Sequence, residues 1–187
     1  MSRLLDLRNA VATQIKAALP AFEVAGHLGR FSATDLDLFL TKAPAVRVAV
    51  LGLTDSAEVD DLSTDYTARL AVFIVTKDGV AKLSRDEAAV AAVETVLLLA
   101  KQTRWGLVGA GVFPAKAPTA QNLSTEQTLK RGVALWGIEI PQPIRLTAPV
   151  ETPADLSELW IGVAPDTGAA HVDDYIGPFP AQGGAGG

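Results

Sequence analysis

The sequence predicts an α+β protein: a mostly antiparallel sheet with an N-terminal helix and a central helix packed on it, followed by an extended C-terminal arm. Two segments have helical apolar spacing, and three runs are rich in Val or alternate in polarity as strands do. The helices are expected at residues 3–19 and 84–102, and the strands at 45–53, 63–76 and 130–140. This order of elements favours helices layered on one sheet.

The first helix is predicted from Leu4, Leu7, Val11 and Ile15, which recur every three or four residues, and Pro20 ends it. A short extended piece should follow at 21–25. Residues 31–42 fit either a helical turn or a strand, and we favour a loop containing a short piece of one of them.

The strand at 45–53 carries Arg47 as its only charge. The run from Thr54 to Asp61 is acidic and polar, which predicts a hairpin loop. The next strand should cover 63–76, and the sequence Lys77-Asp78-Gly79 favours a turn after it.

The second helix should start at Ser84, because Glu87 three residues later completes a capping-box pattern. It is apolar on most faces and is therefore expected to be central. A loop rich in Gly and Pro follows at 106–118, and residues 120–127 fit a strand. Pro141 and Pro143 should end the last strand, at 130–140, because proline cannot donate to a ladder.

The chain is expected to divide into a domain at 1–144 and an arm at 145–187. Prolines recur in the arm, yet large apolar side chains are spread between them, which a plain linker would not need. We therefore expect the arm to dock on its own sheet or on a neighbouring copy, and only its Gly-rich tip, 181–187, to be a flexible end. The proposed anchors are Leu156, Trp160, Tyr175 and Phe179.

Composition excludes several classes of function. The 187 residues are 49% hydrophobic and 20% charged, enough for a packed core. With no cysteine there is no disulfide framework and no thiolate metal site. The net charge is −5, and the sixteen basic residues are dispersed, so tight nucleic-acid binding is not expected. No apolar run is long enough to span a membrane, and no leader is predicted.

No catalytic, cofactor or metal site is predicted, and the chain is not expected to be an enzyme. His27 and His171 lie far apart and lack a ligand motif. The pair Asp35 and Asp37 is interpreted as solvated loop acids. The glycines of 106–111 follow a helix instead of opening one, so they do not match a dinucleotide fingerprint.

The order of segments resembles that of the tail terminator proteins of Mu-like tailed bacteriophages. The likeness covers residues 3–141 and is one of overall pattern, without a short diagnostic motif. Its parts are the helix ending at Leu19-Pro20, the strand at 45–53, the acidic run, the strand at 66–76, the helix at 84–102 and the run from Trp136 to Ile140.

The resemblance implies an α+β subunit of a six-membered ring at the head-proximal end of the phage tail. Such a ring caps the tail tube and joins it to the head connector, so the tube protein and the connector protein are the implied partners and DNA only passes through the lumen. The protein would be made in the host cytoplasm and reside in the virion.

Within such a ring, an acidic loop facing the lumen would repel the DNA backbone. The residues placed there are Asp55, Glu58, Asp60 and Asp61. An outer, solvated hairpin is the alternative for these residues. The arm anchors would contact the adjacent subunit or the connector.

Other functions remain open at this point. A head–tail connector or head completion protein would share the ring geometry. A small cytosolic binding module would instead be a monomer with an apolar ligand pocket. A hydrolase using Asp60 or Asp61 with His27 is the least favoured, because no catalytic motif accompanies them.

Overall fold

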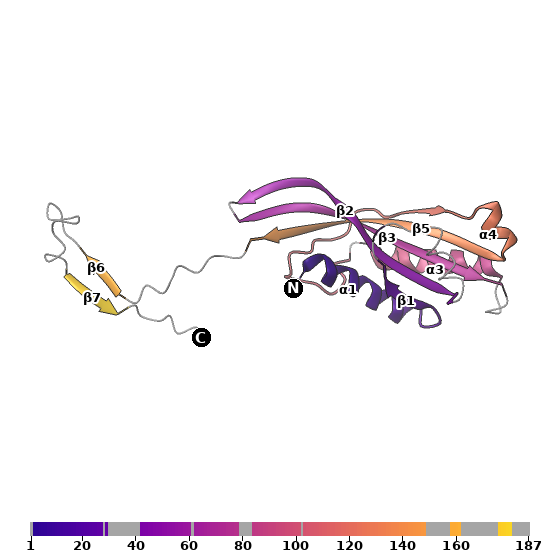
Figure 1. The fold of residues 1–187 in the computed structure, drawn as a ribbon, viewed down its shortest axis with the longest axis horizontal. Coiled ribbons are helices and arrows are strands. Elements are labelled where there is room, and N and C mark those ends of the chain that lie inside the picture. The colour runs from indigo at the N-terminus through magenta and orange to yellow at the C-terminus, as the bar shows by residue number, and fades with distance from the viewer. Residues whose placement is uncertain are drawn as a thin grey trace. The chain divides into compact units, whose positions relative to one another are not determined.

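The computed structural model describes residues 2–27, 29, 42–60, 62–78, 84–101 and 103–148, and the two strands 158–161 and 176–180. It confirms the α+β class. The elements of the main unit are α1 (Arg3–Ala18), β1 (Glu23–Gly26), β2 (Ala45–Asp60), β3 (Ser63–Lys77), α3 (Arg85–Ala100), β4 (Thr119–Asn122), α4 (Glu126–Lys130) and β5 (Val133–Thr147) (Figure 1).

The five strands form one sheet in the order β1-β2-β3-β5-β4. Strands β2, β3 and β5 are antiparallel neighbours, and β4 is antiparallel to β5. Only β1 is parallel to its neighbour, β2, with Glu23 opposite Ala45. β3 is therefore the central strand, and it pairs with β5 over its whole length.

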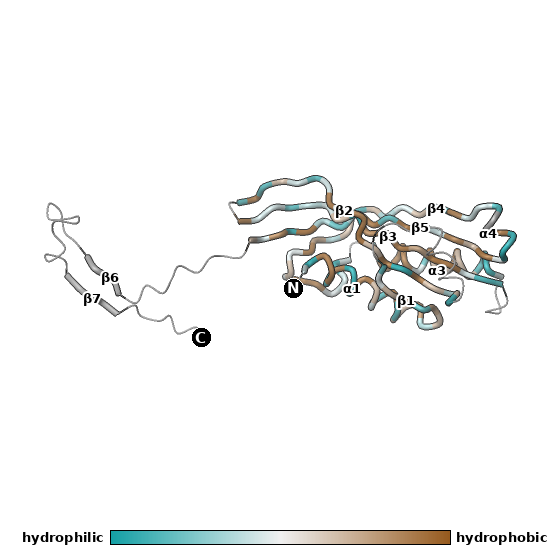
Figure 2. Tube along the Cα trace, viewed as in Figure 1, coloured by the Kyte–Doolittle hydropathy of each residue, from teal (hydrophilic) through white to brown (hydrophobic). Residues whose placement is uncertain are grey.

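One core joins the two long helices to one face of the sheet. Leu7, Val11 and Ile15 of α1 are fully buried, as their spacing predicts. Every second residue of the central strands is buried against the helices, which is the pattern expected of a sheet with a covered face. These positions include Val46, Val48, Leu70, Val72, Ile74, Ile138 and Ile140. Figure 2 shows apolar positions recurring along these strands and on the helices.

Helix α3 begins as its sequence predicts. The Glu87 backbone N–H donates to the Ser84 hydroxyl at 3.3 Å, and the Ser84 N–H donates to the Glu87 carboxylate at 2.9 Å. The hydrogen bond from the Ser84 side chain lowers the pKa of Glu87. The reciprocal bonds satisfy two backbone donors that the first helical turn would otherwise leave unpaired.

The prediction that Pro141 and Pro143 end the last strand is wrong, because β5 continues to Thr147. Their carbonyl groups accept hydrogen bonds from the N–H groups of Lys116 and Phe113, at 2.9 and 3.0 Å. The backbone polar groups of both prolines therefore face the 111–116 segment, away from β3. A missing N–H on that side leaves the β3–β5 ladder intact.

The region after α3 also differs from expectation. β4 ends at Asn122, and residues 126–130 form the helix α4 where the sequence favoured a strand up to 127. Thr125 caps α4: its hydroxyl accepts from the Thr128 N–H at 3.3 Å, and the Thr128 hydroxyl accepts from the Thr125 N–H at 2.8 Å. Of the ambiguous segment 31–42, only Lys42 lies among the described residues.

The chain divides into two compact units, Met1–Ala148 and Pro149–Gly187. In the second unit, β6 (Glu158–Ile161) and β7 (Ile176–Pro180) form a two-stranded antiparallel sheet. The first unit thus extends to the end of β5, beyond the boundary expected at residue 144.

Candidate functional site

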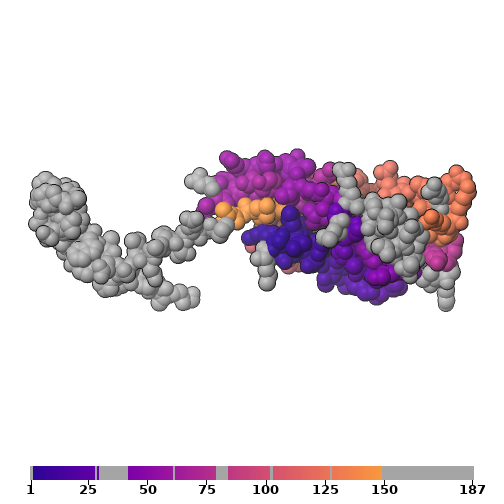
Figure 3. Space-filling view, viewed as in Figure 1, coloured from indigo at the N-terminus to yellow at the C-terminus, as the bar shows by residue number. Residues whose placement is uncertain are grey.

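The most distinctive surface of the main unit is the end of the β2–β3 hairpin, which we call the distal hairpin: residues 54–60 of β2 and 62–67 of β3 and its turn. With the end of β5 it extends past the N-terminal end of α1 (Figure 1) and forms a ridge in the space-filling view (Figure 3). All of residues 54–60 are exposed. The apolar side chains of Val59 and Leu62 are 46% and 45% exposed.

Three bulges interrupt the pairing of β2 with β3, one before the distal hairpin and two within it, and each adds a residue to β2. The pairing with β3 shifts between Val50 and Gly52, between Thr54 and Ala57, and between Glu58 and Asp60. Bulges of this kind increase the local twist and redirect a strand. They account for the hairpin leaving the plane of the covered sheet.

The hairpin loop predicted at Thr54–Asp61 is wrong, because β2 continues through it to Asp60. Asp55, Glu58 and Asp60 are therefore exposed residues of a strand, while Asp61 lies outside the described residues. Asp55 sits at a bulge with a φ of 55°, a conformation that Asp tolerates better than most residues. The prediction failed because polar residues are typical both of turns and of strands whose two faces are exposed to solvent.

Asp60 organises the turn itself. Its carboxylate accepts the backbone N–H of Leu62 at 2.9 Å, and this bond is the main reason that the pKa of Asp60 is lowered. The carboxylate thereby accepts an N–H that a backbone carbonyl would otherwise accept, in a turn with two residues between the strands.

An ion pair ties the middle of the distal hairpin to β5. The Arg145 guanidinium donates to both carboxylate oxygens of Asp65, at 2.7 and 2.9 Å, and lies 5.3 Å from the centre of the Phe113 ring. The side-chain hydrogen bond from Arg145 lowers the pKa of Asp65. Further along, Arg69 donates to Glu139 at 2.7 Å and lowers the pKa of that carboxylate in the same way.

Acid should loosen the distal hairpin before it unfolds the core. The pKa of Asp65 in the folded protein lies below the ordinary value of an aspartate, so the ion pair stabilises the folded hairpin fully above that ordinary value. This stabilisation is lost as the pH falls through the lower pKa of the folded state. The protection factors of the amides at residues 63–67, which correct for the intrinsic pH dependence of exchange, should therefore fall below about pH 4. Asp65→Asn should show that loss of protection already at pH 6, whereas Asp55→Asn should not. Equal behaviour of the two variants would contradict this role of the pair.

A buried polar bridge fixes the loop between α3 and β4 to β5. Trp105 is 2% exposed, and its indole N–H donates to the side-chain carbonyl of Gln142 at 2.8 Å. The Gln142 side-chain amide, fully buried, donates to the Phe113 carbonyl. The bridge satisfies each of these buried groups, and it holds the loop against the strand edge that carries Arg145.

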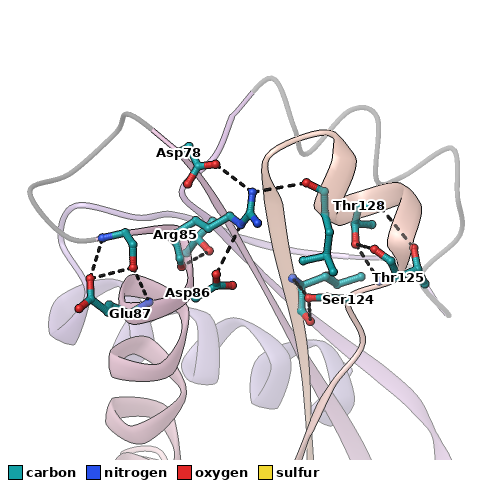
Figure 4. Close-up of polar contacts among 11 residues, drawn as sticks. Asp78, Arg85, Asp86, Glu87, Ser124, Thr125 and Thr128 are labelled. Carbon is teal, nitrogen blue, oxygen red and sulfur yellow. Dashed lines mark hydrogen bonds and ion pairs between the residues drawn. The ribbon is translucent and has the colours of Figure 1, made fainter.

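A second polar cluster closes the opposite end of the sheet (Figure 4). The Arg85 guanidinium donates to the carboxylate of Asp78 at 2.9 Å and to the Leu129 carbonyl at 3.4 Å. It thereby connects the start of α3, the end of β3 and the helix α4. Because all these contacts join elements of the same unit, we interpret the cluster as one that stabilises the fold.

On the sheet face opposite α1 and α3, which we call the outer face, a shallow hollow lies beside β4. Its volume is about 390 Å³, and Leu51, Phe73, Ala120, Leu123 and Gly137 are among its lining residues. Gly137 shapes it, since a Cβ atom there would approach Leu123 Cδ1 to 2.8 Å. The Leu123 side chain can therefore lie across β5.

The sequence did not place the arm residues in regular structure. Trp160 lies in β6 and Phe179 in β7, where Phe179 pairs with Leu159 through the backbone. Leu156 and Tyr175 fall outside the described residues. The two strands form a hairpin in the arm. The sequence did not predict it, because the recurring prolines argued against regular elements there.

The residues considered for chemistry are dispersed. The His27 N–H donates to the Val48 carbonyl at 2.8 Å, continuing the β1–β2 ladder, and His171, Asp35 and Asp37 lie outside the described residues. Within the described ranges, no group of three or more His, Cys, Asp or Glu side chains is arranged to hold a metal ion. Gly106, Gly109 and Gly111 all have positive φ and form turns of the loop that Trp105 anchors.

Comparison with protein-family models and with curated proteins found no match to this chain. Among the described residues, no helix has the length and apolar character needed to cross a membrane.

Proposed function

We propose that this protein is a ring-forming tail terminator of a Mu-like tailed phage, which caps the tail tube and joins it to the head connector. The proposal comes from the resemblance in segment order over residues 3–141. It is supported by the α+β fold, in which the helix, the long hairpin, the second helix and the last strand follow one another as that resemblance implies.

The distal hairpin is the observation that carries the proposal. A ring subunit needs surfaces that reach its neighbours instead of a closed pocket. The hairpin extends the sheet, is tied to β5 by the ion pair of Asp65 and Arg145, and exposes Val59 and Leu62 near its tip. Exposed apolar side chains on a projecting element are suited to burial between subunits.

We assign the acids of the distal hairpin to the lumen of this ring. Asp55, Glu58 and Asp60 are exposed and close together on one segment of β2. A ring would repeat this segment around its axis, so that negative charge would line the passage and repel DNA phosphates. The arm anchors, including Trp160 and Phe179, would contact the adjacent subunit.

Ring formation is tested by the mass of the full-length chain in solution and by negative-stain imaging. A hexamer of this 19.5-kDa chain would have a mass of about 117 kDa and an open centre. Adding the purified protein to growing tail tubes should stop their elongation. A chain that stays monomeric and leaves tube growth unchanged would contradict the proposal.

Neutralising the lumen acids should leave the ring intact but allow it to retain DNA. We expect a ring of the variant Asp55→Asn, Glu58→Gln, Asp60→Asn to associate with duplex DNA more strongly than the unchanged ring at low salt, because three fewer carboxylates in each subunit repel the phosphates. The Asn at 60 keeps an oxygen that can accept from Leu62.

The matched control for this variant neutralises three exposed acids elsewhere, Asp6, Glu94 and Glu126, and changes the net charge equally. Gel-shift titration at low salt compares the two rings. If both bind DNA equally, the position of the hairpin acids has no special role and the assignment to the lumen is wrong.

A further inference from the structure

The β6–β7 sheet is too small to be stable alone. Its strands have four and five residues, and an isolated two-stranded hairpin of this length is marginal in water. Its sequence is nevertheless rich in large apolar residues: Leu159, Trp160, Ile161, Ile176 and Phe179. Such a hairpin needs a surface to pack on or a sheet edge to extend.

The main unit offers an edge of the right kind at β4. Among the described strands, β4 pairs with β5 alone, and all four of its residues are exposed. The Leu123 N–H donates to the Leu135 carbonyl, so by alternation the backbone groups of Ala120 and Asn122 face away from β5. The strand contains neither a charge nor a proline, the usual protections of a sheet edge.

The outer-face hollow lies beside this edge, and residues of β4 line it together with residues of β2, β3 and β5. Phe73, Leu123 and Gly137 contribute apolar lining, and Gln121 of β4 also lines the hollow. A strand added along β4 would place alternate side chains over this hollow. Backbone pairing and an apolar contact are thus available together.

The length of the chain limits docking on its own β4 to the near part of that strand. Ten Cα–Cα steps separate Ala148 from Glu158, so the linker spans at most about 33–36 Å. β4 pairs with residues 136–139, which lie nine to twelve positions back along β5, or about 30–40 Å at the rise of a strand. The direct route along that edge is already occupied, since Gly111, Phe113 and Lys116 bond to β5 there.

We propose that the β6–β7 hairpin of one copy docks on the β4 edge and the adjacent outer-face hollow of a second copy. This inference rests on the proposed function, to which it adds the surface that receives the arm. Each subunit then both gives an arm and receives one, a head-to-tail contact that closes into a ring when the rotation between copies permits.

Because the chain has no cysteine, the contact can be tested by site-specific cross-linking without background. One full-length chain carries Gln121→Cys at the edge, and a second carries Glu158→Cys in β6. After mixing, a short bis-maleimide should join the two chains. The control pairs Glu158→Cys with Val108→Cys, at an exposed loop position of the same unit. We expect the Gln121 pair to react at least about tenfold faster, as a site-specific contact would require.

Two further variants decide between outcomes. Ala120→Pro removes an outward-facing N–H while leaving the β4–β5 bonds, and it should lower the yield about tenfold, the loss of roughly one interfacial hydrogen bond. A single chain carrying both cysteines, at high dilution, reports docking on its own β4. Equal rates for test and control pairs, or a dominant intrachain product, would overturn the inference.

The readouts also separate this inference from the proposed function. If rings of about 117 kDa form but the Gln121–Glu158 cross-link does not, the proposed ring stands and the arm contact is overturned. The product in dimers or open chains, with no closed ring, would support the arm contact and contradict the terminator.

Discussion

Replacing Trp105 by alanine should lower the free energy of unfolding by about 3–5 kcal/mol, the range typical of a large aromatic side chain removed from a core. The indole is 2% exposed and belongs to the same core cluster as the two long helices. Its loss leaves a cavity and also leaves the buried Gln142 side chain without its donor. Denaturant unfolding of the full chain measures the effect.

Gln142→Leu separates the polar part of this loss from the packing part. Leucine fills much of the glutamine volume, but the buried Trp105 indole N–H and the half-buried Phe113 carbonyl then lose their side-chain partner. We expect a loss of about 1–3 kcal/mol. Gln121→Leu, at an exposed position, is the matched control and should change stability by less than about 0.5 kcal/mol. A Gln142→Leu variant as stable as this control would show that the bridge does not stabilise the fold.

The second large effect should come from Gly111→Ala. Gly111 has a φ of 68°, and a Cβ atom there would come within 2.9 Å of the Arg145 carbonyl oxygen. That oxygen belongs to β5, and the Arg145 N–H donates to the Gly111 carbonyl at 2.7 Å, so the two backbones cannot separate without breaking a bond. We expect a loss of about 2–4 kcal/mol, combining backbone strain with this collision.

Gly109→Ala is the control for Gly111. Its φ of 79° imposes a similar conformational penalty, but no atom lies within 4 Å of the added Cβ. Its loss should therefore be only about 1 kcal/mol. Thermal unfolding of both variants isolates the contact with β5. Equal losses would mean that the approach of the two backbones contributes nothing measurable.

The regular elements could be predicted wherever burial imposes a period. Helix α1 was fixed by Leu7, Val11 and Ile15, which face the sheet, and α3 by the capping box at Ser84. The covered half of β2 and most of β3 were found for the same reason. Where no second layer covers the sheet, as on β2 from Thr54 onward, the sequence loses its alternation and resembles a loop.

Other features depend on partners distant in sequence. β5 continues through Pro141 and Pro143 because the 111–116 segment lies on the side where their N–H groups are missing. Gln142 was not singled out by any motif, because its importance arises from Trp105, 37 residues away. The acids at 55, 58 and 60 were predicted to be exposed. Their position on a bulged strand could not be predicted, because the bulges depend on how β2 pairs with β3.

The pairing of the three long strands has a consequence for how this chain can change in length. All fifteen residues of β3 pair with β5 in one unbroken register. Inserting or deleting one residue in either strand would move every side chain beyond that point to the opposite face of the sheet, so that buried residues become exposed and exposed residues become buried. β2 already accommodates three extra residues as bulges. Single-residue insertions and deletions should therefore be tolerated in the outer half of β2 and rejected in β3 and β5.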